Sequence, residues 1–263
     1  MKRHYTALWL LLLVAFALFA AASAVDMPEI AGHKFKSSEI VPSLLAAEDD
    51  ESAVATPDTV AVETEGGQAF PVPCDTVPKT ILFIGDSMLE GLGPRLAAYA
   101  EKNGHTLYSV IWYSSTSEVW GRSGKLRHYI DTLAPDYVFV CLGANELFVP
   151  DITEKRRGYV RHILADIDAI PFVWIGPPNW KPDTGINDLI AAETPEGAFF
   201  LSDGMHFVRG KDGAHPTRES AAEWMDSVAR WMPAHCLHPI RMDKPEKESG
   251  RPKRTFVHQP SEK

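Results

Sequence analysis

Short apolar runs alternate with amphipathic stretches between residues 79 and 232. The apolar runs predict strands, and the stretches with apolar residues every three or four positions predict helices. The predicted strands cover residues 80–84, 107–112, 137–142, 172–175 and 198–201, and the predicted helices cover residues 88–102, 117–133, 154–169 and 216–231. Apolar strands separated by helices are typical of a parallel sheet that is covered on both faces. The pattern therefore predicts an α/β domain over residues 79–237.

The first residues have the pattern of a targeting segment rather than of a folded element. Lys2 and Arg3 form a basic start, residues 7–21 are apolar, and residues 22–24 are small. This order is typical of a secretory signal peptide over residues 1–24, cleaved after Ala24. The apolar run is short for a membrane-spanning helix, and an uncleaved anchor remains the alternative. We expect export, with the periplasm as the destination.

The segments on either side of the predicted domain lack sustained periodicity. Residues 25–78 mix small, acidic and proline residues, which predicts a flexible linker. Residues 238–263 are rich in proline and charge, which predicts a disordered tail. Such a tail could make weak contacts with anionic cell-wall polymers or with a membrane surface.

Net charge and cysteine content narrow the range of functions. The formal net charge is -9, which argues against general affinity for nucleic acid. The chain has 3 cysteines, and Cys141 lies in an apolar strand pattern that predicts a core position. Cys74 and Cys236 flank the predicted domain, and a disulfide between them is left open, as is the oligomeric state.

The first candidate for chemistry follows the first predicted strand. The apolar residues 81–84 end at Gly85-Asp86-Ser87, and a helical pattern begins directly afterwards. A serine at this turn would lie at the carboxyl edge of the sheet, where open α/β sheets bind ligands. The alternative is that Ser87 only caps the helix that follows.

Two later segments decide between these interpretations. They are LGANEL at residues 142–147 and KDGAHPT at residues 211–217. Together with the GDS at residues 85–87, and in this order, they resemble the SGNH subgroup of the GDSL esterases and acyltransferases. The resemblance spans residues 79–232 and implies a flavodoxin-like three-layer α/β/α sandwich with about five parallel strands.

The resemblance also assigns the catalytic residues. It implies Ser87 as nucleophile, His215 as general base and then acid, and Asp212 as the residue that orients the imidazole. Asp203 and His206 have the same spacing and are a competing pair. We prefer Asp212 and His215 because a predicted helix follows His215, and we expect His206 to line the substrate pocket instead.

An esterase must also stabilise the negative oxygen of its tetrahedral intermediate. Asn145 matches the oxyanion-hole asparagine of the family, and the Ser87 N–H would be a second donor. The family's third donor is a glycine N–H after the second strand, where this chain has no glycine. By position we expect the Ser115 N–H, with Gly121 as the alternative. Family members usually have an aspartate directly after this asparagine, whereas this chain has the longer Glu146.

The expected function is hydrolysis of an ester through an acyl-serine intermediate, without a cofactor or metal. The nucleophile context is not GxSxG, and no phosphate-binding loop or zinc spacing is present. The expected export and the aromatic residues near the strand ends, Trp180 above all, suggest the substrate: O-acetyl groups on a carbohydrate or cell-wall polysaccharide. The alternatives are a polysaccharide O-acetyltransferase, a lipase or thioesterase, and a catalytically silent glycan-binding module.

Overall fold

Six parallel strands form one sheet in the computed structural model of the chain, which describes residues 72–260. The segments predicted as signal peptide and as most of the linker, residues 1–71, lie outside the described residues. Within residues 72–260 no helix has the length and apolar content needed to span a membrane. The elements are, in chain order, β1 (Thr80–Gly85), α3 (Leu89–Asn103), β2 (Thr106–Trp112), α4 (Ser117–Ser123), α5 (Lys125–Leu133), β3 (Tyr137–Cys141), α6 (Ile152–Ile167), β4 (Phe172–Ile175), α7 (Ile186–Glu193), β5 (Phe199–Phe200), α8 (Arg218–His235) and β6 (Arg254–His258).

The strand order identifies the class of fold. The sheet runs β5-β4-β3-β1-β2-β6, and every neighbouring pair is parallel. Strands β1 to β5 have the order of flavodoxin-like folds, in which β2 is added on one side of β1 and the strands from β3 onward on the other side. The flavodoxin-like three-layer prediction is confirmed, with β6 as an additional edge strand beside β2.

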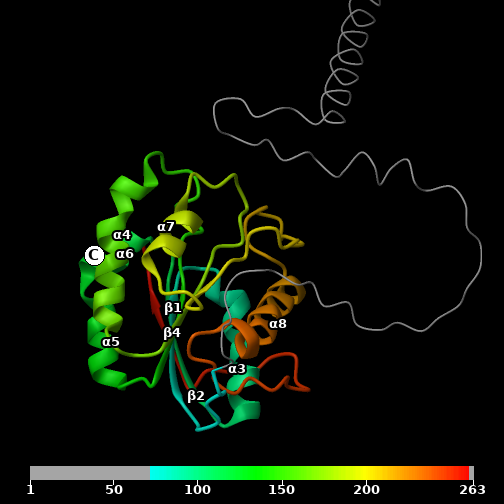
Figure 1. Ribbon diagram of the computed structural model, residues 1–263. Helices are drawn as coiled ribbons and strands as arrows, with labels where there is room; N and C mark the ends of the chain where they lie inside the picture. The colour runs from blue at the N-terminus through cyan, green and yellow to red at the C-terminus, as the bar shows by residue number, and fades with distance from the viewer. Residues whose placement is uncertain (1–71, 261–263) are drawn as a thin grey trace, which may run out of the picture. The chain divides into compact units, whose positions relative to one another are not determined.

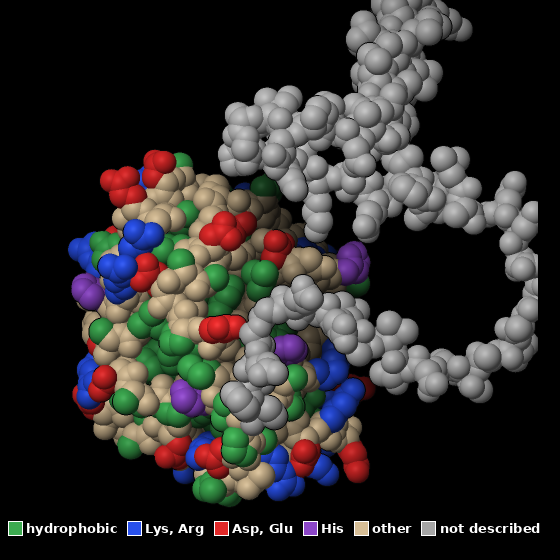
Figure 2. Space-filling view, in the orientation of Figure 1, with side chains coloured by type: hydrophobic (Ala, Val, Ile, Leu, Met, Phe, Trp, Pro, Cys, Tyr) green, Lys and Arg blue, Asp and Glu red, His purple; other side chains and the backbone are tan. Residues whose placement is uncertain are grey.

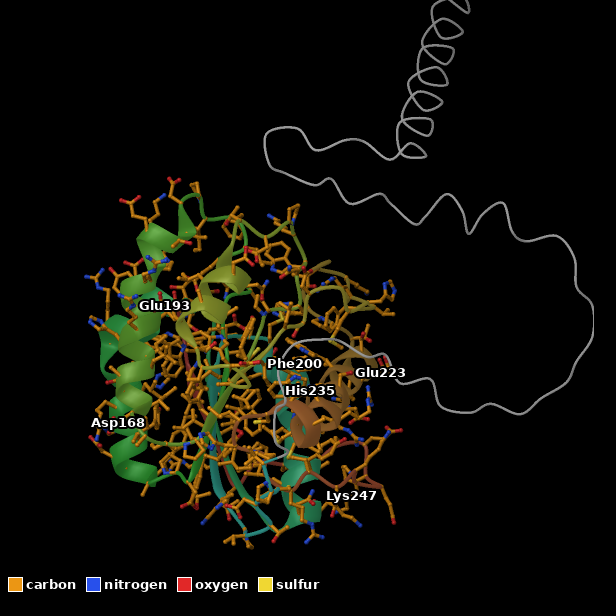
Figure 3. The ribbon with its side chains drawn as sticks, in the orientation of Figure 1. Asp168, Glu193, Phe200, Glu223, His235 and Lys247 are labelled. Carbon is orange, nitrogen blue, oxygen red and sulfur yellow. The ribbon has the colours of Figure 1, made fainter. Side chains whose placement is uncertain are left out.

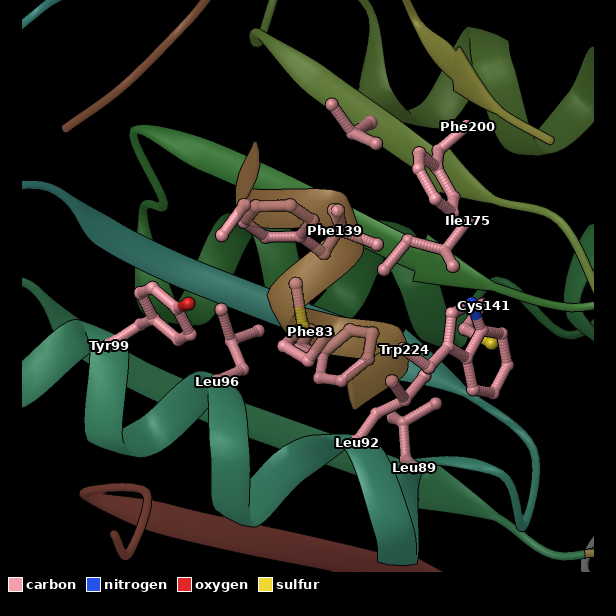
Figure 4. Packing of buried hydrophobic residues seen from close by; sticks show 14 of the residues in the cluster. Phe83, Leu89, Leu92, Leu96, Tyr99, Phe139, Cys141, Ile175, Phe200 and Trp224 are labelled. Atoms are coloured by element: carbon pink, nitrogen blue, oxygen red, sulfur yellow. The ribbon is translucent and has the colours of Figure 1, made fainter. Parts of the chain in front are cut away.

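Helices cover the sheet on both faces (Figure 1). On one face α3 and α8 bury Leu92, Leu96 and Trp224 against Phe83 and other strand side chains (Figure 4). On the other face the helices α4 to α7 bury a second apolar cluster. The strands between them are buried on both sides, which is why they appear in the sequence as unbroken apolar runs.

The helix predicted over residues 117–133 is two helices. Gly124 separates α4 from α5 and has a φ of 65°, in the left-handed region where glycine is favoured. The sequence analysis also missed α7, which follows a proline-containing loop and has only eight residues. Short helices give too few turns for their periodicity to be recognised.

The C-terminal prediction of a disordered tail from residue 238 is wrong. Residues 237–253, here called the strap, run along α3, and β6 then pairs with β2. Side chains of α3 and its flank hold the strap: the Asn103 side chain exchanges hydrogen bonds with the backbone of Asp243 at 2.9 and 3.0 Å, and His105 Nε2 bonds Arg241 O at 2.8 Å. The domain therefore extends to at least His258.

The chain before β1 is joined to the strap. Asp75 pairs with Ile240, and its backbone N–H donates to the carbonyl of Pro239 at 2.8 Å. Cys74 is exposed, Cys236 is buried, and all three cysteines, including Cys141 in β3, are free thiols in this structure. The structured part of the chain therefore begins before residue 79, where the sequence analysis had placed the boundary.

Candidate active site

The turn after β1 presents Ser87 at the carboxyl edge of the sheet. Gly85 is required there because a Cβ at this position would lie 2.2 Å from the carbonyl oxygen of Cys141 in β3. The Asp86 carboxylate, through Oδ1, accepts the N–H of Met88 at 2.9 Å. Asp86 therefore serves the backbone at the start of α3, and the Ser87 hydroxyl is left for another partner.

That partner is His215, which lies 128 residues later in the sequence. Its Nε2 is 2.8 Å from Ser87 Oγ, and its Nδ1 is 2.7 Å from Asp212 Oδ2. The structure thus brings the three predicted residues together in one hydrogen-bonded chain. In this arrangement Nε2 can take the serine proton while the carboxylate fixes the tautomer of the imidazole.

The Asp212 carboxylate is held in its charged form. Its Oδ1 accepts the backbone N–H groups of Ala214 and His215 at 2.9 and 3.0 Å. Together with the His215 side chain, these donors lower the pKa of Asp212 to about 2. The same carboxylate thus shapes the loop and orients the base.

Arg209 fixes the loop that carries His215. Its guanidinium donates to Ala214 O at 2.5 Å, and to the carbonyls of Pro178 and Asn179 at 2.9 and 3.0 Å. These bonds join the histidine loop to the loop that follows β4. Sequence analysis missed Arg209, because the neighbours of a basic side chain in a loop cannot be identified without the fold.

Replacing Arg209 by methionine is expected to lower kcat for an activated ester roughly 100-fold, because small misplacements of a catalytic group are costly. We expect KM to change less than kcat, and Arg209→Lys to recover part of the rate. Steady-state kinetics would measure both. The control is Lys211→Met, an exposed cation in the same loop. Equal effects of Arg209→Met and Lys211→Met would contradict the positioning role.

Asn145 lies where β3 ends and faces the same turn. Its Nδ2 donates to Ser115 O at 3.0 Å and, with a longer bond of 3.3 Å, to Asp86 Oδ2. The Ser87 N–H makes no hydrogen bond within residues 72–260. The amide of Asn145 and this free N–H are the two donors that the sequence analysis had assigned to the oxyanion hole. Both amide hydrogens of Asn145 have protein acceptors here, and the bond to Asp86 is the longer of the two.

The prediction for the third donor needs correction. The Ser115 N–H donates to Trp112 O at 3.1 Å and closes a turn, so it is already used, and its carbonyl is what holds Asn145. Ser114, one residue earlier, has a φ of 56°. This left-handed conformation is the one that glycine favours, and it turns the backbone directly after β2. The Ser114 N–H makes no hydrogen bond within the described part of the chain.

Gly121, the alternative donor, serves helix packing instead. A Cβ at this position would lie 2.8 Å from the carbonyl oxygen of Tyr159, so the glycine allows α4 to approach α6 closely. Its position inside α4 commits its backbone to the helix.

A buried ion pair supports the Asn145 loop. Glu146 is fully buried, and its carboxylate accepts the N–H and the hydroxyl of Ser117, each at 2.8 Å. Arg156 of α6 donates to the same carboxylate at 2.8 Å. The longer acid of this chain therefore joins the loop to α4 and α6.

The remaining predicted site residues lie around this edge of the sheet. Trp180 is half-buried, and its Nε1 donates to Ala144 O at 2.8 Å, beside Asn145. His206 is exposed and forms no pair with Asp203, whose carboxylate accepts from Asn179 at 3.2 Å instead. The competing Asp203–His206 pair is therefore not assembled. No group of His, Cys, Asp and Glu within residues 72–260 is arranged to hold a metal ion.

A small cavity opens beside the nucleophile. It has a volume of about 200 Å³ and is lined by Ser87, Met88, Glu90, Gly91, His215, Pro216 and Arg218. Trp180 and His206 are not among its lining residues. One acidic and one basic side chain, Glu90 and Arg218, make the cavity polar. Glu90 also accepts a hydrogen bond from the hydroxyl of Tyr113, which follows β2.

Neither a protein-family model nor a curated protein sequence matches the chain. Among solved structures the chain is similar to TesA, with a TM-score of 0.42 and 20% identity over 57% of this chain and 95% of that one. It is also similar to the psychrotrophic esterase EstA from Pseudoalteromonas sp., with a TM-score of 0.39 and 19% identity over 58% of this chain and 97% of that one. A third is a lipolytic protein of the G-D-S-L family from Desulfitobacterium hafniense DCB-2, described in its name as putative, with a TM-score of 0.36 and 14% identity over 57% and 98%.

Proposed function

We propose that the protein is a serine esterase that hydrolyses short acyl esters through an acyl-serine intermediate. One observation carries this proposal: the unbroken chain from Ser87 through His215 to Asp212, with bonds of 2.8 and 2.7 Å, at the mouth of a cavity. Ser87 attacks the ester carbonyl, His215 takes its proton and returns it to the leaving alcohol, and water then repeats the sequence on the acyl-enzyme. The negative oxygen of each intermediate is held by the N–H groups of Ser87 and Ser114 and by Asn145, which exchanges its longer bond, the one to Asp86, for the bond to the intermediate.

The cavity favours a short acyl group, with acetyl as the proposed one. It measures about 200 Å³, and Glu90 and Arg218 are both part of its lining. A long alkyl chain would have to displace water from these charged groups without replacing its hydrogen bonds, which is unfavourable. The carbohydrate alcohol and the exported location remain part of the proposal on the sequence features described above.

A panel of p-nitrophenyl esters tests the reaction and the acyl length together. We expect wild type to cleave the acetyl ester, and kcat/KM to fall from butyrate to octanoate. Ser87→Ala is expected to lower kcat by about 10⁴-fold or more, because no acyl-enzyme can form. A serine-directed phosphonate should label wild type and not Ser87→Ala.

Other results of the ester panel would favour other functions. A preference for octanoate would favour a lipase or thioesterase over an acetylesterase. Faster release from p-nitrophenyl acetate when sugar is added would indicate transfer of the acetyl group rather than hydrolysis. Absence of both labelling and cleavage would contradict the proposed function.

A further inference from the structure

A second and larger hollow adjoins the catalytic cavity. It has a volume of about 360 Å³ and lies between the first half of α3, the first half of α8 and strap residues 244–249. Gly91 and Arg218 line both hollows, so the larger one opens next to Ser87 and His215. This size falls in the range of roughly 300–1,000 Å³ that is typical of small-molecule sites. We call it the strap groove.

The two helices that form the groove both begin beside the catalytic residues. Ser87 precedes α3 and His215 precedes α8, so the groove leads away from the reacting atoms between the two helices. A Cβ on Gly91 would lie 2.7 Å from Cβ of Ala221, which shows how closely the helices approach there. Gly91 and Ala222 are small and leave space between the larger side chains of the lining.

The strap wall of the groove is firmly attached. Arg95 is buried and donates to Lys247 O at 2.6 Å, while the N–H of Gly250 donates to Pro94 O at 2.8 Å. A Cβ on Gly250 would lie 2.7 Å from the backbone nitrogen of Ala98, so strap and helix are in direct contact. The wall therefore exists before any ligand arrives, which reduces the entropic cost of binding.

Some charged side chains of the groove form ion pairs within the protein, and the others are available to a ligand. Asp226 is paired with Arg95 at 2.6 Å and with Lys244 at 3.2 Å, and this network is satisfied within the protein. The guanidinium of Arg218 makes no hydrogen bond within residues 72–260, and it lies where the two hollows meet. The other charged lining residues are acidic: Glu223, Glu246 and Glu248, and Glu219, whose carboxylate also interacts with Thr217 and with Arg218.

This composition selects among possible ligands. Four carboxylates against the one guanidinium of Arg218 disfavour an anionic ligand, because like charges repel. Carboxylates accept hydrogen bonds from hydroxyl groups, so a neutral ligand with many hydroxyl groups fits the acceptor-rich surface. In Figure 3, Glu223 on α8 and Lys247 on the strap lie on the same side of the molecule, away from Asp168 and Glu193. Figure 2 shows acidic and basic side chains close together on the surface rather than one basic patch.

We propose that the strap groove binds the alcohol part of the ester and that this alcohol is a neutral carbohydrate. The inference rests on the proposed esterase function and adds to it the site and the charge of the leaving group. Arg218 lies at the junction and donates hydrogen bonds to the sugar next to the ester. The glutamates along the groove accept hydrogen bonds from the following hydroxyl groups.

The test compares two acetyl esters with different alcohols. Acetylated xylo-oligosaccharides should occupy the strap groove, whereas p-nitrophenyl acetate is too small to need it. We expect Ala222→Trp, which fills the groove, to lower kcat/KM for the oligosaccharide at least tenfold more than for p-nitrophenyl acetate. The matched control is Arg230→Trp, exposed on the same helix and outside the groove lining, which should leave both values unchanged.

A second variant tests the charge argument without adding bulk. Glu223→Lys changes an exposed side chain and should fold normally. We expect wild type to cleave acetylated oligogalacturonides, which are anionic, at least tenfold less efficiently than the neutral oligosaccharides. Glu223→Lys should narrow this difference severalfold.

The possible failures can be distinguished. Equal losses on both acetyl esters in Ala222→Trp, or a wild-type preference for the anionic polymer, would overturn the groove assignment while leaving the esterase function in place. If wild type cleaves neither ester and the phosphonate does not label Ser87, the esterase function itself fails.

Discussion

Replacing His215 by alanine is expected to lower kcat for p-nitrophenyl acetate by about 10⁴-fold or more. The Nε2 atom of His215 lies 2.8 Å from Ser87 Oγ, so the variant removes the group that accepts the serine proton. A serine hydroxyl without an adjacent base is a weak nucleophile at neutral pH. Steady-state rates and the rate of labelling by a serine-directed phosphonate should fall together.

The sequence itself offers the matched control, His206→Ala. His206 follows Asp203 by the same three residues that separate His215 from Asp212, but it is exposed, and the Asp203 carboxylate is bound to Asn179. We expect this variant to keep kcat within about twofold, because His206 does not line the cavity beside Ser87 and substitutions of exposed residues usually change stability little. A large loss in His206→Ala with a small loss in His215→Ala would reverse the assignment of the base.

The sheet could be predicted because its strands are buried on both faces and therefore appear as apolar runs. The strand β6 (Arg254–His258) could not, because it lies at the edge of the sheet and three of its five residues are exposed. Its pairing with β2 depends on the strap that precedes it, and the strap is fixed by side chains of α3 more than 130 residues away in sequence. A composition rich in proline and charged residues indicates low helix content. It does not show whether the backbone forms hydrogen bonds with distant parts of the chain.

The triad could be predicted because each member lies beside a recognisable strand or helix boundary. The groups that position it were missed for a common reason: they act through the backbone. Arg209 binds three carbonyls, and Ser114 matters for its φ of 56° and its N–H rather than for its side chain. Ser115 was the wrong choice because distance along the chain from β2 does not tell which N–H the turn uses.

Asp86 is a buried carboxyl whose ionisation is expected to have a large effect on stability. It is fully buried next to Ser87, and burial raises its pKa to about 7, although the Met88 N–H and the nearby His215 favour its charged form. An unfolded aspartate titrates near 3.8. Between these two values the folded state retains a proton that the unfolded state has lost. The stabilising contribution is therefore complete below pH 3.8 and is lost as the pH rises to about 7.

Asp86→Asn should remove this dependence, since asparagine is neutral at every pH. A shift of about three pKa units corresponds to about 4 kcal/mol. We therefore expect the free energy of unfolding of the variant, minus that of wild type, to increase by about this amount between pH 4 and pH 8, as measured by urea denaturation. Any constant cost of placing an amide beside Asn145 cancels in this difference. Asp188→Asn, an exposed carboxyl on α7, serves as the control for the change of one charge. A difference that stays constant with pH in Asp86→Asn would show that this carboxyl is ionised at both ends of the range.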